Sequence, residues 1–189
     1  MRLVCTFVVT AIMACGASVA PLDAGPSPQP NLARNGSFEA PDSGTEFKSL
    51  NQNARVGLTR GRTGNALKLT TASGLYGNSF GSEWKVVAPA AGTYCLITWM
   101  TSTSTATVVR LLKFSPSTGN GENLDFTMPG PLTMWTKVPP NVKHSASLAT
   151  GDELSVVITD RTASASTVIE VDDIDLWLSP DGRCEDTRP

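Results

Sequence analysis

The chain has 189 residues, a formal net charge of -2 and a sequence pI near 5.4. This length suits one domain with a substantial core, and it is too short for two ordinary domains once an N-terminal segment is set aside. Lysine and arginine are not clustered, so the charge pattern gives no electrostatic reason to expect binding to nucleic acid.

Residues 1–20 have the features of an export signal. A positive residue near the start is followed by an apolar run over 3–14, which is too short to span a bilayer as a helix. Residues 12–16, IMACG, resemble the lipobox of bacterial lipoproteins, in which Cys15 becomes the lipidated first residue, although the first two residues depart from that pattern. Cleavage after Ala20 by an ordinary signal peptidase is the alternative. We therefore expect an exported protein that is either anchored to a membrane through lipid or secreted.

Residues 16–30 are rich in proline and small residues and hold nothing to bury, so we expect a tether. The folded domain is then expected over 31–189. Its abundance of Thr, Ser, Gly, Ala and Val, without long runs of Leu, Glu and Lys, favours short strands over helices.

Short strands separated by turns run through this domain. Asn35-Gly36 predicts a tight turn near its start, with Phe38 as a buried aromatic. Strands are predicted over 46–50, 56–60, 66–71, 83–88, 93–101, 107–114, 124–127, 132–138, 153–160 and 168–178. Residues 72–82 and 115–123 are predicted loops. About ten short strands predict one all-β domain, a sandwich or jelly roll.

The last predicted strand has an irregularity at Asp172-Asp173. The apolar residues before and after this pair have opposite parity: Ile169 and Val171 before it, and Ile174, Leu176 and Leu178 after it. A β-bulge at the pair would return all five apolar residues to the core side and re-aim one carboxylate.

Cys5 would be lost with the signal and Cys15 would carry lipid, which leaves Cys95 and Cys184 as a pair. An even pair in an oxidising compartment predicts a disulfide, with two unpaired thiols as the alternative. The bond would close a loop of about ninety residues and contribute roughly 4 kcal/mol in the chain-entropy model. Without a Cys-x-x-Cys motif, and with the single histidine, His144, in a predicted polar loop, a conventional zinc site is not expected.

Six short stretches, in this order, resemble the CenC-type carbohydrate-binding modules over essentially residues 31–178. They are NLxxNGSFE, GNALKL, GTYCLITW, MWTKV, GDELSVVI and VDDIDLW. The resemblance implies a galactose-binding-like jelly roll, a β-sandwich of two antiparallel sheets that binds carbohydrate without catalysis. It also implies a structural calcium near the first and last strands.

Carried over from this resemblance, Glu39 and Asp172 would be side-chain calcium ligands, with backbone carbonyls around Ser37 and Lys68 completing the shell. Calcium takes six to eight oxygens, so two carboxylates alone are insufficient. The alternative is that both carboxylates satisfy turns without a metal, and Asp173 then faces solvent.

A sugar site needs flat aromatic rings beside hydrogen-bonding side chains. Tyr76 and Trp84, with Asn78 and Glu83 in or beside a polar loop, are predicted to form the ligand surface. The alternative is that these rings only pack the loop. Trp99, in a central strand, is expected in the core.

The sequence therefore predicts a non-catalytic, exported module that binds a glycan. A structural or protein-interaction sandwich without a sugar site is one alternative, because no row of aromatic residues is visible. A glycan-active hydrolase is the other; it needs two carboxylates about 5 to 10 Å apart, and no motif marks a pair such as Glu83 and Glu122. Residues 77–81, GNSFG, match a serine hydrolase pattern, but a strand rather than the required helix is predicted after them.

Overall fold

The computed structural model describes residues 30–40, 47–50, 54–71, 78–139, 144–162 and 166–184. The predicted signal and tether, with Cys15, lie outside these ranges, as does the predicted ligand residue Tyr76. No helix within the described ranges is long and apolar enough to cross a membrane.

The described residues form strands β1 to β12. Their bounds are β1 (Phe47–Ser49), β2 (Ala54–Arg60), β3 (Asn65–Thr71), β4 (Asn78–Ser82), β5 (Val86–Val87), β6 (Gly92–Ser102), β7 (Ala106–Ser115), β8 (Asn120–Pro129), β9 (Leu132–Val138), β10 (His144–Leu148), β11 (Glu153–Asp160) and β12 (Val168–Ser179). Most of them coincide with runs of β-branched and aromatic residues in the sequence, which suit a pleated and half-buried surface.

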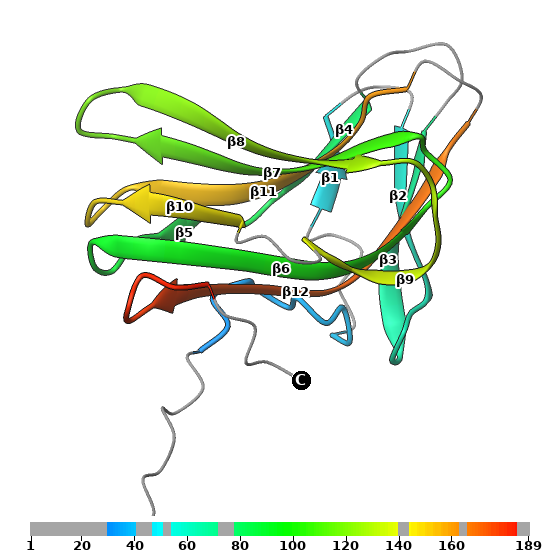
Figure 1. Cartoon of the computed structure of the whole chain (residues 1–189), viewed down its shortest axis with the longest axis horizontal. Coiled ribbons are helices and arrows are strands. Elements are labelled where there is room, and N and C mark those ends of the chain that lie inside the picture. The colour runs from blue at the N-terminus through cyan, green and yellow to red at the C-terminus, as the bar shows by residue number, and fades with distance from the viewer. Residues whose placement is uncertain are drawn as a thin grey trace, which may run out of the picture.

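The strands build two antiparallel sheets that pack face to face (Figure 1). Sheet A has the order β1-β4-β11-β7-β8, with β5 also paired to β11, and sheet B has the order β10-β6-β12-β3-β2, with β9 also paired to β6. The predicted all-β fold, a two-sheet antiparallel sandwich, is thus confirmed.

The inner faces of both sheets share one hydrophobic core. Leu69 and Leu96 enter it from sheet B, and Leu111 and Ile158 enter it from sheet A. All four are at most 1% exposed, and burying such a side chain contributes roughly 1.5–3 kcal/mol. Because strand side chains alternate, the neighbours of these residues point to the two outer faces of the sandwich.

Four predictions of strands and loops are corrected by the structure. Residues 78–82, predicted as loop, form β4, while the strand predicted over 83–88 is reduced to β5. Strand β4 pairs with β1 on one edge and β11 on the other, and this pairing overrides the weak preference of Asn, Ser and Gly for strands. Strand β8 begins at Asn120, inside a predicted loop, and His144 begins β10 rather than lying in a loop.

The predicted bulge in β12 is confirmed. Pairing with β6 runs to Asp172 and resumes at Asp175 with a shifted register. Asp173, between them, has a φ of 47°, in the left-handed region. Val171 before the bulge and Ile174 after it are both buried, as the parity argument requires.

The N-terminal segment completes sheet B beyond this bulge. Strand β3 pairs with β12 only as far as Val171. From there the start of the domain takes over, since Leu32 N donates to Leu176 O at 2.6 Å and Ile174 N donates to Gly36 O at 2.9 Å. The two ends of the folded domain are therefore held together along one strand.

The predicted disulfide between Cys95 and Cys184 is present, with the two Cα atoms 5.5 Å apart, an ordinary separation for a disulfide. Cys95 packs with Ile97 and Trp177 in a small cluster separate from the main core, and Cys184 packs against it. The bond therefore ties the end of the described chain to the outer face of sheet B.

Candidate functional site

Trp84 does not face a ligand surface. Its side chain is only 7% exposed and belongs to the main core, where it meets Phe47 edge-on with ring centroids 6.2 Å apart. Trp84 has the same parity as Val86, which also points inward. The prediction that Trp84 stacks on a sugar is therefore wrong.

The other predicted ligand residues are not brought together. Glu83 is exposed and pairs with Lys48 at 2.9 Å near the β1 edge of sheet A. Asn78 lies at the start of β4, where its backbone is opposite Asp160 of β11. With Trp84 buried beside Glu83, the predicted ligand residues that lie within the described ranges offer no aromatic platform.

The predicted metal ligands, in contrast, meet at one turn. We call this the clasp region: residues 35–39, the β2–β3 turn at 61–65, and the bulge at 172–175. Asp172 is fully buried, and its Oδ2 accepts the N–H of Arg62 at 2.9 Å and of Thr63 at 3.3 Å. Its Oδ1 accepts the N–H of Asp173 at 2.9 Å.

Glu39 reaches the same turn from the N-terminal segment. Its Oε1 accepts the N–H of Asn65 at 2.7 Å, and the buried Phe38 beside it anchors the segment to the core. Two positions of the turn, 61 and 64, have room only for glycine. A Cβ on Gly61 would lie 2.5 Å from Asp172 Oδ2 and 2.7 Å from the Asn65 carbonyl oxygen. A Cβ on Gly64 would enter the Glu39 carboxylate.

The clasp region disfavours the charged form of the Asp172 carboxylate. Burial raises the pKa of Asp172 above its ordinary value, and the charge of Asp173 raises it further, while the N–H groups of the turn offset only part of this. The described residues contain no cluster of three or more His, Cys, Asp or Glu side chains for a metal. Two carboxylates and the Asn65 carbonyl nevertheless supply oxygens of the kind that calcium takes, so these residues fit calcium in kind.

A different surface offers room for a ligand on the outer face of sheet A. Residues opposite each other in β7 and β11 share a face, and the outward pairs include Phe114 with Glu153 and Leu112 with Ser155. Phe114 is 40% exposed and Leu112 is 36% exposed. Two neighbouring apolar side chains are therefore partly exposed on this face.

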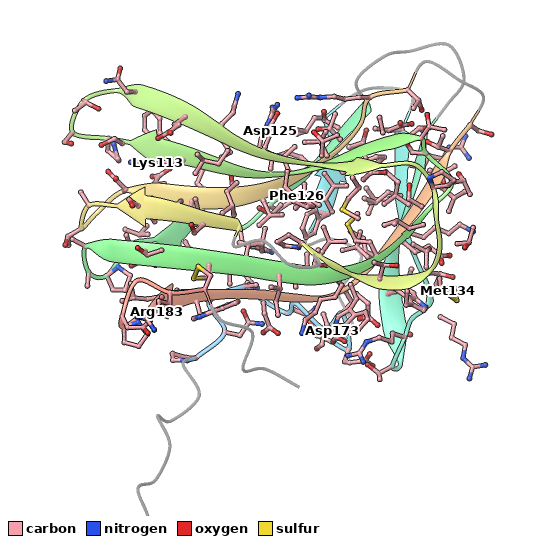
Figure 2. The ribbon with its side chains drawn as sticks, viewed as in Figure 1. Lys113, Asp125, Phe126, Met134, Asp173 and Arg183 are labelled. Carbon is pink, nitrogen blue, oxygen red and sulfur yellow. A yellow bond between two sulfur atoms is a disulfide. The ribbon has the colours of Figure 1, made fainter. Side chains whose placement is uncertain are left out.

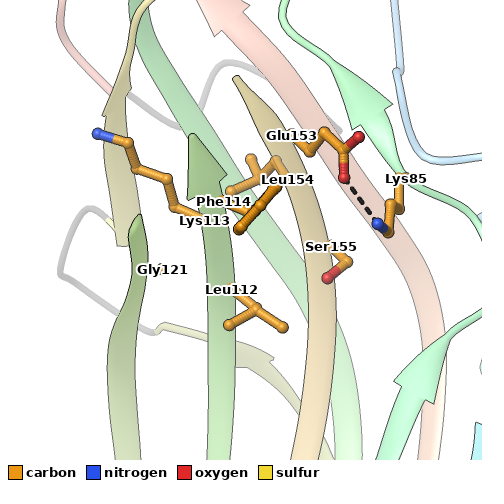
Figure 3. A pocket seen from close by; sticks show the side chains of 8 residues that line it. All are labelled: Lys85, Leu112, Lys113, Phe114, Gly121, Glu153, Leu154 and Ser155. Atoms are coloured by element: carbon orange, nitrogen blue, oxygen red, sulfur yellow. Dashed lines mark hydrogen bonds and ion pairs between the residues drawn. The ribbon is translucent and has the colours of Figure 1, made fainter. Parts of the chain in front are cut away.

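These side chains line a groove of about 230 Å³ (Figure 3). The lining residues are Lys85, Leu112, Lys113, Phe114, Gly121, Glu153, Leu154 and Ser155. Gly121 of β8 lies opposite Phe114, and a Cβ there would meet nothing closer than the Lys113 carbonyl oxygen at 3.7 Å. The space beside the Phe114 ring is therefore open.

Charged groups flank the apolar floor of this groove. Lys85 Nζ lies 2.6 Å from Glu153 Oε2, as Figure 3 shows, and both side chains are partly exposed. Further along the same face, Arg110 binds Asp125 with two hydrogen bonds of 2.6 and 2.9 Å. The bonds from Arg110 hold the pKa of Asp125 below its ordinary value, so this carboxylate stays charged.

The alternation of side chains along β7 could have revealed this groove from the sequence. Leu111 faces the core, so Leu112 and Phe114 must both face outward, on the side of a strand where polar residues are usual. Figure 2 shows Lys113 and Asp125 on the side of sheet A, and Asp173 and Met134 on the side of sheet B. The groove and the clasp region therefore belong to different sheets.

Neither the protein-family models nor the curated proteins contain a match to the chain. Solved structures do match its fold. The arabinose-bound α-L-arabinofuranosidase MgGH51 superposes with a TM-score of 0.58 and 18% identity over 81% of this chain, although the match spans only 27% of that enzyme.

Two similar structures are whole binding modules. TmCBM61, solved with β-1,4-galactotriose, has a TM-score of 0.51 and 18% identity over 80% of this chain and 100% of its own. The family 11 carbohydrate-binding module of the cellulosomal cellulase Lic26A-Cel5E of Clostridium thermocellum has a TM-score of 0.53 and 15% identity, over 80% and 95% respectively. The chain therefore shares the β-sandwich fold of these carbohydrate-binding modules.

Proposed function

We propose that this protein is a non-catalytic glycan-binding module whose ligand surface is the groove on the outer face of sheet A. The observation that carries the proposal is the exposed Phe114 ring, flanked by Leu112 and by the Lys85–Glu153 ion pair. The apolar C–H face of a sugar can pack on such a ring while polar side chains bind its hydroxyl groups.

Each part of the groove has a role in this proposal. Phe114 and Leu112 take the apolar face of the sugar, and the space above Gly121 admits the ring beside them. Lys85 donates hydrogen bonds to hydroxyl oxygens, and Glu153 accepts them from hydroxyl groups. The similarity in fold to TmCBM61 and to the family 11 module supports a binding function over a catalytic one.

The direct test is a glycan array followed by calorimetry with the full chain. We expect binding to at least one glycan, and Phe114→Ala should weaken it by about tenfold or more, because an aromatic contact to a ligand contributes on the order of 1–3 kcal/mol. Met134→Ala is the matched control, because Met134 is 76% exposed on β9 of sheet B. Equal affinity of the Phe114 variant and the wild type would contradict the proposed surface, and an array without any bound glycan would contradict the function.

We also propose that the clasp region binds a structural calcium ion, as in the CenC-type modules that the sequence resembles. Glu39, Asp172 and the carbonyl of Asn65 would hold it, with further backbone oxygens and water completing the shell. The buried charge of Asp172 and the glycine-lined turn support this assignment. When bound, the ion would stabilise the fold and take no part in sugar recognition.

Export and lipidation on Cys15 complete the proposal, on the evidence of the sequence of residues 1–20. The protein would then display its groove from a membrane surface on the tether over 16–30. Intact mass of the protein from a membrane fraction tests this directly. Acyl chains on a chain that begins at Cys15 are expected, and an unmodified chain beginning after Ala20 would show ordinary secretion.

A further inference from the structure

A second pocket lies on the outer face of sheet B, on the other sheet from the groove. It holds about 270 Å³, and the residues of its lining that matter here are Ser37, Arg62, Ile97, Trp99, Asp173 and Asp175. Its walls come from β6, β12, the β2–β3 turn and the N-terminal segment. The clasp region supplies part of this lining, namely Ser37, Arg62, Asp173 and Asp175.

Trp99 forms an aromatic wall of this pocket. It is half-buried and points outward from β6, opposite Lys137 of β9, which corrects the expectation that Trp99 belongs to the core. The guanidinium carbon of Arg62 lies 4.5 Å from the centre of the Trp99 ring, and Lys137 Nζ lies 5.7 Å from it. Two cations therefore flank a single indole ring.

Arg62 has donors to spare. A guanidinium carries five N–H groups, and within the described part of the chain the side chain of Arg62 makes one hydrogen bond, from Nη2 to Asp173 Oδ2 at 2.6 Å. About a third of this side chain is exposed. Its backbone is fixed because Asp172 accepts the Arg62 N–H, so the guanidinium is presented from a rigid turn.

We propose that this pocket binds a saccharide that carries a single carboxylate group, such as a uronic acid residue. The guanidinium fork of Arg62 matches a carboxylate, and Lys137 supplies a second positive charge beside it. The Trp99 ring, with the Arg62 guanidinium lying over it, then forms an apolar wall beside the sugar.

The acidic residues of the pocket set the charge of the ligand. Asp173 and Asp175 can accept hydrogen bonds from sugar hydroxyls, but they repel a densely charged polyanion. This combination selects a hydroxyl-rich ligand with one acidic group. The pocket differs from the groove on sheet A in position and in ligand charge, so the two proposals stand or fall separately.

The test is a titration of the full chain with methyl galacturonoside and with methyl galactoside. The two sugars differ only at C6, which is a carboxylate in the first and a hydroxymethyl group in the second. We expect the acidic sugar alone to bind, in the millimolar range typical of a single sugar ring, and to shift the indole N–H signal of Trp99 in the NMR spectrum. Arg62→Gln should weaken binding about tenfold or more. Arg55→Gln, at an exposed position of β2, is the matched control.

Two further variants separate this site from the groove and from unfolding. Phe114→Ala should leave binding of the acidic sugar unchanged, and Lys137→Gln should weaken it even if Arg62→Gln proves unstable. Equal binding of the neutral sugar, an equal response to acetate alone, or full affinity in both the Arg62 and Lys137 variants would each overturn the proposal.

Discussion

Asp160 in sheet A and Asp172 in sheet B are both buried, yet their surroundings differ. Asp160 accepts hydrogen bonds from side-chain hydroxyls, including those of Ser104 and Thr162 at 2.6 Å and that of Thr167. Burial raises its pKa, but these bonds outweigh the effect, so the pKa of Asp160 lies below its ordinary value. At Asp172 burial wins, and the pKa is raised.

The difference lies in the donors and in the neighbouring charge. Hydroxyl groups can rotate to suit a carboxylate, and those around Asp160 also join the two sheets, since Thr71 of β3 in sheet B donates to Asp160 Oδ2 at 3.4 Å. Asp172 has backbone N–H groups in fixed positions and a second carboxylate, Asp173, next to it. The surroundings of Asp160 therefore stabilise its charged form, whereas those of Asp172 compensate its charge only in part.

The largest expected effect comes from removing the charge of Asp160. Asp160→Asn should lower the free energy of unfolding by about 3 kcal/mol, because several charge-assisted hydrogen bonds are lost and an amide N–H then faces hydroxyl donors. Urea unfolding measures the loss, with the partly exposed Asp125→Asn as the control. A loss no larger than that of the control would show that the hydroxyl network contributes little.

Calcium should separate the two aspartates. At calcium concentrations about 100-fold above the dissociation constant, binding adds about 2.7 kcal/mol of stability, which corresponds to roughly 5–10 °C in the melting temperature. A chelator should remove this gain in the wild type and in Asp125→Asn. Asp172→Asn should show no gain at all. A wild-type melting temperature that does not respond to calcium or to chelator would remove the metal from the clasp region.

Alanine substitutions at two glycines test whether the β2–β3 turn requires the space that Gly64 leaves for the Glu39 carboxylate. Gly64 and Gly119 have φ values of 66° and 72°, but a Cβ on Gly119 meets nothing within 4 Å, whereas one on Gly64 enters the Glu39 carboxylate. Both alanine variants should lose about 1–2 kcal/mol from the left-handed backbone. Gly64→Ala should lose more than Gly119→Ala and should also weaken the response to calcium. Equal losses of stability and equal responses to calcium in the two variants would show that the Glu39 carboxylate does not contribute to the clasp region.

The smallest effect is on the pH dependence of stability, measured in chelator. The lowered pKa of Asp160 gives stability that is present above its unfolded value, about 3.9, and lost as pH falls through its folded value. The raised pKa of Asp172 gives the opposite dependence of stability on pH. Its contribution to the free energy of unfolding is fully present below the unfolded pKa of about 3.9 and is lost as pH rises through the folded pKa.

Unfolding at a series of pH values checks this prediction. Acidification should narrow the stability gap between wild type and Asp160→Asn. The same change should raise the stability of wild type relative to Asp172→Asn. If the stability of both variants relative to wild type changed with pH in the same direction, the predicted difference between the pKa shifts of Asp160 and Asp172 would be contradicted.

Local alternation was enough to predict much of the fold. The parity switch around Asp172 located the bulge, and the cysteine count located the disulfide between Cys95 and Cys184. Strand β4 was missed because its Asn, Ser and Gly residues have little strand preference of their own, and pairing with distant strands decides its structure.

The candidate site was harder to predict because it depends on the sheet order. The groove is lined by residues of β7, β8 and β11, and the pairing of these strands cannot be read from the sequence. The open space beside Phe114 and Gly121 could therefore not be predicted. Trp84 was misplaced for a related reason, because a short polar stretch does not show which way its aromatic residue turns. The family resemblance marked Glu39 and Asp172, and both carboxylates do lie at the β2–β3 turn, while their role as calcium ligands stays a prediction.

The proposed glycan surface can be tested by filling it. Gly121→Val places a side chain beside the Phe114 ring, where a Cβ meets only the Lys113 carbonyl oxygen at 3.7 Å, and valine also suits a strand. Calorimetry with a glycan that the wild type binds should show an affinity lowered about tenfold or more, at an unchanged melting temperature. Wild-type affinity with the valine in place would contradict glycan binding in this groove.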